Sequence, residues 1–374
     1  MRSHSVRTWS IAAVVAASPG MLLAADPAVP ATANVPGWTD TLTAWGLTVN
    51  GYVATSYCRS NGYPSNVHEF DIQHDTFQLD QAGLQVAYQP KSGFGALVDV
   101  FAGEDARILN QSESGPTDHS AFDVRQAFLQ YTTGPLAVIA GKFVTLAGAE
   151  YINPTQNTNF SRSLLFTWSE PLTHTGIRAT WAVTDTFTLI GGVNNGWNVT
   201  STSYGSKSGE VGLAWTPNKT FSFTTQAYIG KNQQYNGERI LVDVVATYNA
   251  TSALTFVVNI DWDQQQFPTK PNATWNGAAL YVNYALNDRW RLSLRGEYLD
   301  DKNGFNFGGT GQALKEVTLT CGYAPVKSFE LRLEGRYDTA QNAIFYRSNP
   351  SEANPALADS LSQIAIQGVY KFGT

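Results

Sequence analysis

The last residues of the chain, 362–374, alternate between apolar and partly polar side chains. Side chains in an extended strand point to opposite faces with a period of two, so this segment predicts one face that ends in aromatics and one that is polar. The apolar face consists of Ile364, Ile366, Gly368, Tyr370 and Phe372, opposite Gln363, Ala365, Gln367, Val369 and Lys371. Such a strand is typical of one that separates lipid from a watery lumen.

The same alternation recurs in other segments, most clearly at 254–263, 290–298 and 329–338. One face of the segment 290–298 carries Trp290, Leu294 and Tyr298, while the other face carries Arg291 and Arg295. The phase slips around Asp80–Gly83, which predicts either a β-bulge or a different register there.

Short and long connections alternate along the chain. Turn residues mark seven short connections, and eight longer polar loops lie around 59–74, 103–121, 146–173, 197–208, 232–237, 265–275, 302–312 and 343–360. These connections predict an all-β fold, a transmembrane antiparallel up-and-down β-barrel of sixteen strands with both termini in the periplasm. The alternative is a soluble β-sandwich, but the strand length and the aromatic residues at strand ends favour closure in lipid.

Composition agrees with a barrel in a membrane. Charged residues make up only 14% of the chain and aromatics 12%, whereas a soluble domain carries about 25% charged residues. The net charge of −6 argues against nucleic acid as a partner. Cys58 and Cys321 lie in predicted strands that are not neighbours, so we expect no disulfide between them.

The N-terminus predicts export. Arg2 and Arg7 precede an apolar run, and small residues follow up to Ala25, which indicates a signal peptide at 1–25. The alternative is a transmembrane anchor, but the run is shorter than the roughly 20 residues that span a bilayer. We expect a flexible lead-in at 26–40 and the barrel at 41–374.

Several motifs resemble the OmpL-like β-barrel porin family, also called porin-2. They are FDIQHDTFQL at 70–79, FDVRQAFLQY at 122–131, GKF at 141–143, GAE at 148–150, NTNFSRS at 157–163, EPLTHTG at 170–176 and NNGW at 194–197. The C-terminal strand is also similar to the one by which outer-membrane barrels are recognised for assembly, except that Gly373 and Thr374 follow the last aromatic. The resemblance covers essentially the whole mature chain and implies an outer-membrane channel.

The longest connection, at 146–173, has the position of the third loop of sixteen-stranded porins, which folds inward and narrows the pore. The resemblance implies a pore constriction formed by Glu150, Arg162 and Glu170, which would face a basic wall residue such as Lys142 or Arg178. The alternative is an external loop that packs on its neighbours.

Strand parity predicts which charged residues line the pore. They are Lys142, Arg178, Asp261, Asp263, Arg291, Arg295, Glu297, Arg332, Glu334 and Arg336, together with Asp99, Asp243, Glu330 and Asp338. Each could instead form an ion pair within the wall. As a hypothesis, basic and acidic residues segregate onto opposite walls around the third loop, so that neutralising Arg295 and Arg332 together would favour cations.

Other chemistry finds little support in the sequence. His174 lies near three serines, but no nucleophile-elbow motif surrounds any of them, so a histidine that bonds the backbone is the simpler interpretation. The acidic and histidine residues at 68–75 match no zinc or calcium pattern, which favours a solvated loop. We therefore expect no catalytic residue, no metal and no cofactor.

The sequence thus predicts a porin of the bacterial outer membrane, not an enzyme. It would allow passive diffusion of small hydrophilic solutes or ions through a water-filled pore and would contact lipid and lipopolysaccharide. Trimers are common among sixteen-stranded porins, so a homotrimer is one open assembly state. The alternative function is a non-conducting adhesin or receptor barrel that acts through its extracellular loops.

Overall fold

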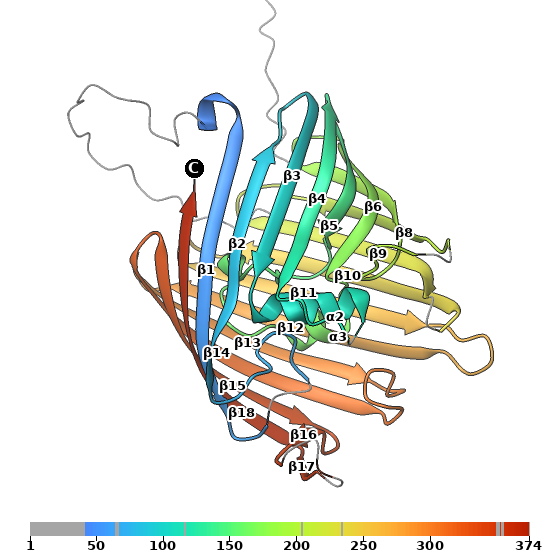
Figure 1. Ribbon diagram of the computed structural model, residues 1–374, viewed down its shortest axis with the longest axis vertical. Helices are drawn as coiled ribbons and strands as arrows, with labels where there is room; N and C mark the ends of the chain where they lie inside the picture. Colours follow the sequence, from blue (N-terminus) through green and yellow to red (C-terminus); the bar gives the residue numbers. More distant parts are fainter. Residues whose placement is uncertain are drawn as a thin grey trace, which may run out of the picture.

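Sixteen strands close into one antiparallel barrel within the residues that the structure describes. The structure is a computed structural model, and it describes residues 42–373 except 64–66, 116, 203–204, 233–234, 349–351 and 353–354. The predicted signal peptide at 1–25 and lead-in at 26–40 lie outside the described residues. Figure 1 shows the strands wrapping around two short helices.

The barrel strands follow chain order around the wall. They are β1 (Leu47–Ser60), β2 (Thr76–Tyr88), β3 (Gly93–Ala102), β4 (Phe122–Thr133), β5 (Leu136–Val144), β6 (Thr173–Ala182), β7 (Phe187–Asn194), β8 (Ser208–Trp215), β9 (Phe221–Asn232), β10 (Gly237–Asn249), β11 (Leu254–Gln265), β12 (Ala273–Ala285), β13 (Trp290–Asp301), β14 (Gln312–Val326), β15 (Phe329–Ala340) and β18 (Ser360–Gly373). The seam is closed by β18, which pairs with β15 on one side and with β1 on the other, where Tyr57 lies opposite Ile366. The sixteen-stranded prediction is confirmed, and the soluble-sandwich alternative is wrong.

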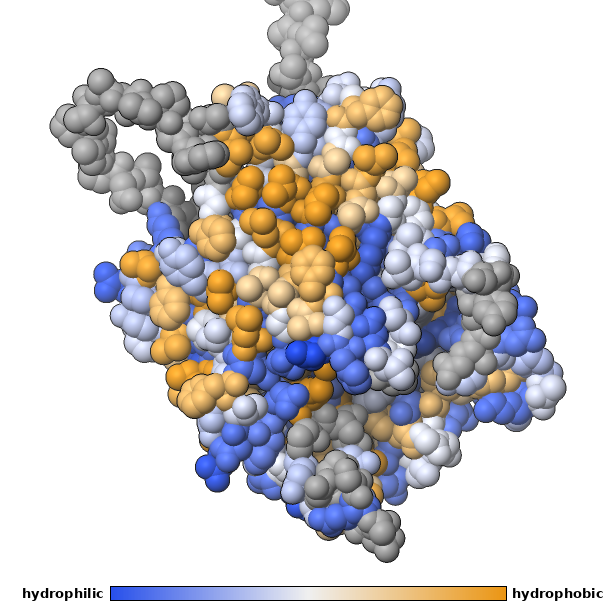
Figure 2. Space-filling model, viewed as in Figure 1, coloured by the Kyte–Doolittle hydropathy of each residue, from blue (hydrophilic) through white to orange (hydrophobic). Residues whose placement is uncertain are grey.

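The apolar side chains face outward and the polar ones inward, the reverse of a soluble domain. In β18, Ile364 is 64% exposed, whereas Gln367 on the opposite face is 2% exposed. Figure 2 shows apolar side chains gathered on the outer face over the first strands. Such an apolar surface is unfavourable in water and favourable in the hydrocarbon core of a bilayer. Closure of the barrel leaves no unpaired sheet edge in the bilayer.

Two bulges interrupt the register on neighbouring parts of the wall. In β2, Asp80 is an extra residue between Leu79 and Gln81, which face Thr55 and Ala54 of β1. In β4, Arg125 is an extra residue opposite the step from Asp99 to Val100 of β3. The predicted bulge at Asp80–Gly83 is confirmed, and both bulges place a charged side chain in the lumen.

The short turns lie at one end of the barrel, with the C-terminus, and the long connections lie at the other (Figure 1). Three of the long connections matter below: loop 1 (61–75), loop 2 (103–121) and loop 3 (145–172). Loop 2 contains helix α2 (Glu104–Ser114), and loop 3 contains the 3₁₀ turn η1 (Pro154–Gln156) and helix α3 (Leu164–Trp168). The last long connection carries a two-stranded ribbon of β16 (Phe345–Tyr346) and β17 (Leu357–Ala358).

Among the described residues, no helix has both the length and the apolar character needed to cross a bilayer. Cys58 in β1 and Cys321 in β14 are free thiols on strands that are not neighbours.

Candidate functional site

Loop 3 folds into the barrel and is held there by the far wall. The backbone N–H of Ala149 donates to Asn259 Oδ1 of β11 at 2.8 Å. The N–H groups of Phe160 and Ser161 donate to the two carboxylate oxygens of Glu334 in β15, at 2.6 and 2.9 Å. Hydrogen bonds to a carboxylate are stronger than neutral ones, so these contacts fix the tip of the loop. The expectation of an inward loop 3 agrees with this geometry.

Helix α3 begins where loop 3 meets β13. Ser163 caps the helix by accepting from the N–H of Phe166 at 3.0 Å, and Glu297 accepts from the N–H of Leu164 at 2.8 Å. A carboxylate at a helix N-terminus satisfies donors that the helix itself leaves without partners. The wall therefore positions α3 through its first turn.

Apolar packing then fills the half of the lumen beneath α3. The buried residues of this cluster come from loop 1, α3, the wall of β12 to β14, the ribbon and β18; they are Val67, Leu164, Leu165, Trp275, Ala279, Tyr281, Leu299, Leu314, Phe345 and Leu361. The Trp275 indole donates to the carbonyl of Trp168 at 3.1 Å. These side chains are buried and packed together, as in the close-packed interior of a protein.

Loop 1 also enters the barrel, contrary to the solvated loop that we expected from the sequence. His68 is buried, with Nδ1 at 2.7 Å from Asp71 Oδ2 and Nε2 at 3.1 Å from Asp338 Oδ2 of β15. Burial and the Arg336 guanidinium lower the pKa of His68, but the two carboxylates outweigh them and raise it to about 9. Loop 1 is thus docked by a buried imidazolium between two carboxylates.

Helix α2 of loop 2 packs between loops 1 and 3. Its Asp105 accepts from Gln81 Nε2 at 2.7 Å. Its apolar side joins a second buried cluster of Phe70, Phe101, Ala106, Leu109, Ile152, Phe166 and Leu172. This helix is not predicted by the sequence analysis, which treats 103–121 only as a polar loop.

Most of the predicted pore-lining residues are buried inside the barrel, against loop 3 or against each other. Lys142 differs, because Ile139 and Phe143 of the same strand line the cavity and strand parity places Lys142 on the other face. Arg295 is fully buried and contacts Glu150, Glu297 and Glu316. Further ion pairs in the described part of the chain include Arg178–Glu210, Arg291–Glu330, Arg332–Glu330, Arg336–Asp338, Arg125–Asp99 and Lys142 with Glu113 and Asp123. In β13 and β15 opposite charges alternate along one strand, which contradicts the expected segregation onto two walls.

The three residues expected at the constriction have different environments. Glu150 is paired with Arg295, not with Lys142 or Arg178 as expected. The Arg162 guanidinium donates to the carbonyls of Tyr151, Phe160 and Ile152 at 2.7–2.9 Å and so holds the loop together from within. Glu170 is buried close to Asp243 and Asp261.

A cavity remains on the opposite side of the barrel. A cavity of about 460 Å³ lies between loop 3 and the wall of β1 to β7. Its polar lining includes Asn50, Gln85, Gln89, Gln126, Gln130 and Thr180 from the wall and Tyr151, Asn153, Thr155 and Gln156 from loop 3. The sequence-predicted residues Asp99, Glu150 and Arg178 also reach it.

A charged network forms one side of this cavity. The Arg125 guanidinium pairs with Asp99 at 2.7 Å and donates to the Tyr52 hydroxyl at 2.8 Å, which in turn donates to Gln81 at 2.7 Å. Arg125 was not among the predicted residues. A signal was present, since polar residues occupy 123 and 125 and then 126, 130 and 132, which is the phase slip of a bulge.

His174 does not meet a serine nucleophile in this arrangement. Its Nδ1 lies 3.1 Å from the carbonyl oxygen of Gly196, and its ring stacks on Tyr228 with centroids 4.6 Å apart. The interpretation of His174 as a histidine that bonds the backbone is consistent with this contact.

Comparison with known proteins gives one family and many similar folds. Residues 46–372 match the family described as "Putative beta-barrel porin-2, OmpL-like". In-vitro folded OmpT of Vibrio cholerae is 14% identical with a TM-score of 0.60, covering 87% of this chain and 97% of that one. DcaP, an outer membrane channel of Acinetobacter baumannii, is 10% identical over the same shares with a TM-score of 0.60.

An anion-selective porin from Comamonas acidovorans is 11% identical with a TM-score of 0.60, covering 87% of this chain and 99% of that one. At these identities the solved structures share the fold. No curated protein matches the chain.

Proposed function

This chain belongs to the porin-2, OmpL-like family of β-barrel porins, and we propose that solutes cross its barrel along the wall of β1 to β7. The protein is a porin of the bacterial outer membrane, and it allows passive diffusion of small hydrophilic solutes or ions. The path that solutes take through the barrel is inferred from the geometry of the lumen.

The observation that carries the route is the cavity of about 460 Å³ between loop 3 and the first strands. Hydrated solutes need polar partners along their path to replace lost water contacts. The cavity offers amides and hydroxyls from both the wall and loop 3. The other half of the lumen is filled by the apolar cluster beneath α3.

The narrow point of this route lies where the cavity meets the second apolar cluster. Ile152, Phe166 and Leu172 of loop 3 line the cavity and also pack with Leu109 of α2. We therefore propose that loop 3 and α2 together set the size limit. Of the residues expected at the constriction, Glu150 borders the cavity and contributes there.

The test is single-channel recording in a planar bilayer, with the route mapped by thiol modification. The background variant carries Cys58→Ala and Cys321→Ala, because both thiols are free. Gln85→Cys and Gln156→Cys place thiols on the cavity lining. Ser293→Cys is the matched control, since Ser293 also faces the lumen but is buried in the filled half.

A cationic thiosulfonate reagent should reduce the conductance of Gln85→Cys and Gln156→Cys and leave Ser293→Cys unchanged. Block of Ser293→Cys alone would place the route in the other half. A folded barrel without discrete conductance steps would favour the alternative of a binding barrel that acts through its loops.

We also propose that the chain acts without catalysis. The support is the porin family together with the environment of His174, which stacks on Tyr228 and bonds to a backbone carbonyl. The variant His174→Ala should conduct like the parent, and no ester substrate should be turned over by either. Ester hydrolysis that is present in the parent and absent in His174→Ala would refute the proposal that the chain acts without catalysis.

The assembly state that we propose is a homotrimer in contact with lipid and lipopolysaccharide. The support is the shared fold with OmpT of Vibrio cholerae, which has a trimer form, and the apolar outer face. Light scattering coupled to size-exclusion chromatography in a nonionic detergent measures the protein mass directly. A protein mass of one mature chain, somewhat below the 40.7 kDa of the full sequence, would indicate a monomer and refute the proposal.

A further inference from the structure

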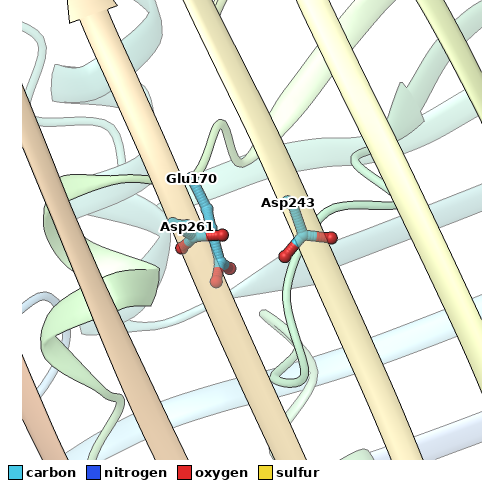
Figure 3. Close-up of side chains that lie close together, drawn as sticks. All are labelled: Glu170, Asp243 and Asp261. Atoms are coloured by element: carbon cyan, nitrogen blue, oxygen red, sulfur yellow. The ribbon is translucent and has the colours of Figure 1, made fainter.

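Three carboxylates meet where loop 3 touches the wall of β10 and β11. They are Glu170 of loop 3, Asp243 of β10 and Asp261 of β11 (Figure 3). One oxygen of each lies within 4.8 Å of the other two. All three side chains are buried, with Asp243 fully inaccessible and Glu170 only 6% exposed.

Among the described residues these carboxylates have no basic partner, although Asp243 is within hydrogen-bond reach of Asp261 and of the Gly148 backbone. In the described part of the chain, no ion pair joins any of the three to a basic side chain. The Asn259 amide donates to Asp243 at 2.8 Å and to Asp261 at 3.3 Å. One oxygen of Asp243 and one of Asp261 have no hydrogen-bond partner among the described residues. Burying unpaired charge in this way is unfavourable.

Glu170 is the second, independent observation that points to a ligand at this site. Its carboxylate points into the space between Asp243 and Asp261 (Figure 3), and neither of its oxygens has a hydrogen-bond partner among the described residues. The backbone makes room for it, because a Cβ on Gly148 would lie 1.8 Å from Glu170 Oε2. Gly148 has φ +87, which a glycine adopts without strain.

We propose that Glu170, Asp243 and Asp261 bind one divalent cation, Ca²⁺ in preference to zinc, and that this ion fastens loop 3 to the wall. The donor set contains only oxygen, which suits a hard cation, whereas zinc favours nitrogen and sulfur ligands. Calcium binds oxygen at about 2.3–2.6 Å, so ligands on opposite sides of the ion lie about 5 Å apart. The three oxygens all lie within 4.8 Å of one another, so one ion can reach all of them.

The ion would neutralise the charge that the protein leaves uncompensated and would link a segment of loop 3 to two neighbouring strands. This inference concerns how loop 3 is held, and it does not depend on the solute route. A failure of calcium binding therefore leaves the proposed route unaffected, and a failure of the route leaves the site unaffected.

The experiment is isothermal titration of CaCl₂ into the full-length barrel, folded in a nonionic detergent and stripped with EDTA. We expect one saturable site in the parent. Asp261→Asn and Asp243→Asn should each weaken binding by about tenfold or more, since even loss of an outer-shell partner costs roughly 10–100-fold in metal affinity.

Asp80→Asn is the matched control. Asp80 is a buried carboxylate on the lumen side, but its oxygens accept from Ser56, Gln78 and Gln367 at 2.6–2.9 Å. Its variant should bind calcium like the parent. A loss at Asp80→Asn equal to that at Asp261→Asn would mean that the ion is bound elsewhere, and would overturn the assignment.

The parent alone gives a second test that needs no variant to fold. Its thermal unfolding midpoint should rise in CaCl₂ relative to EDTA, and magnesium should raise it less. A folded parent that binds no calcium, with an unchanged midpoint, would overturn the proposal and indicate that the three carboxyl groups hold protons instead.

Discussion

Replacing Glu334 by glutamine should loosen the tip of loop 3 by a predictable amount. The Glu334 carboxylate accepts from the N–H groups of Phe160 and Ser161 and from the Thr320 hydroxyl. In Glu334→Gln one oxygen remains an acceptor, and the other becomes an NH₂ that faces a backbone donor. At least one hydrogen bond to a charged group is lost, which costs about 1.5–3 kcal/mol.

That loss corresponds to a roughly 10- to 150-fold increase in the opening equilibrium of the loop. The amides of Phe160 and Ser161 should exchange with deuterated solvent faster by the same factor, as measured by hydrogen exchange with mass spectrometry. The matched control is Asp301→Asn, because Asp301 likewise accepts from the N–H groups of Phe305 and Asn306, at 3.0 and 2.8 Å. This variant should speed exchange in 302–311 and leave loop 3 unchanged.

The reasoning would be refuted if exchange at 157–163 were unchanged in Glu334→Gln while Asp301→Asn accelerated exchange in its own loop. The assay would then be shown to work, and Glu334 would not be what holds loop 3.

Three further outcomes follow from the lumen geometry. The pKa of His68 is raised from 6.5 to about 9, so its ion pairs are fully formed below pH 6.5 and are lost as the pH rises through 9. The Trp168 indole donates to the Val67 carbonyl at 3.0 Å. The fluorescence of Trp168 should therefore report this step in the parent and not in His68→Phe. Gly148→Ala should displace loop 3, since the added Cβ would lie 1.8 Å from Glu170 Oε2, and single-channel recordings should show an altered conductance that the exposed-turn control Gly134→Ala does not. Arg125→Gln leaves Asp99 unpaired at the cavity, so the reversal potential in a salt gradient should shift toward cation selectivity. Arg332 is buried and does not line the cavity, so Arg332→Gln should shift the reversal potential less. An equal shift in both variants would contradict the proposed route.

The barrel itself could be predicted from sequence because strand parity reports directly on which face meets lipid. The alternation in 362–374 identified the outward set from Ile364 to Phe372, and these residues are exposed while Gln363 and Gln367 are buried. The slip at Asp80–Gly83 even located a bulge. Each of these signals is local, since period-two patterning needs only neighbours along the strand.

The contents of the lumen could not be predicted in the same way. Strand parity shows that Arg295 faces inward. It does not show that the Arg295 guanidinium meets the Glu150 carboxylate of loop 3, at 2.8 Å, where an open pore would offer water. The pairing of His68 with Asp338 joins residues 270 positions apart, and no pattern in the sequence measures that separation. Residues predicted to line an open pore therefore became anchors for three inserted loops.

The anchoring of loop 3 also constrains the order in which the molecule can be built. The groups that hold this loop come later in the chain: Glu297 follows Leu164 by 133 positions, and Glu334 follows Phe160 by 174. Contacts of such long range form late, because the chain must first be brought together over a large separation. Loop 3 can thus reach its final conformation only after β13 and β15 have been placed, and a chain truncated before β13 would retain the loop without the acceptors that hold it. The final shape of the lumen therefore depends on strands near the C-terminal end of the chain.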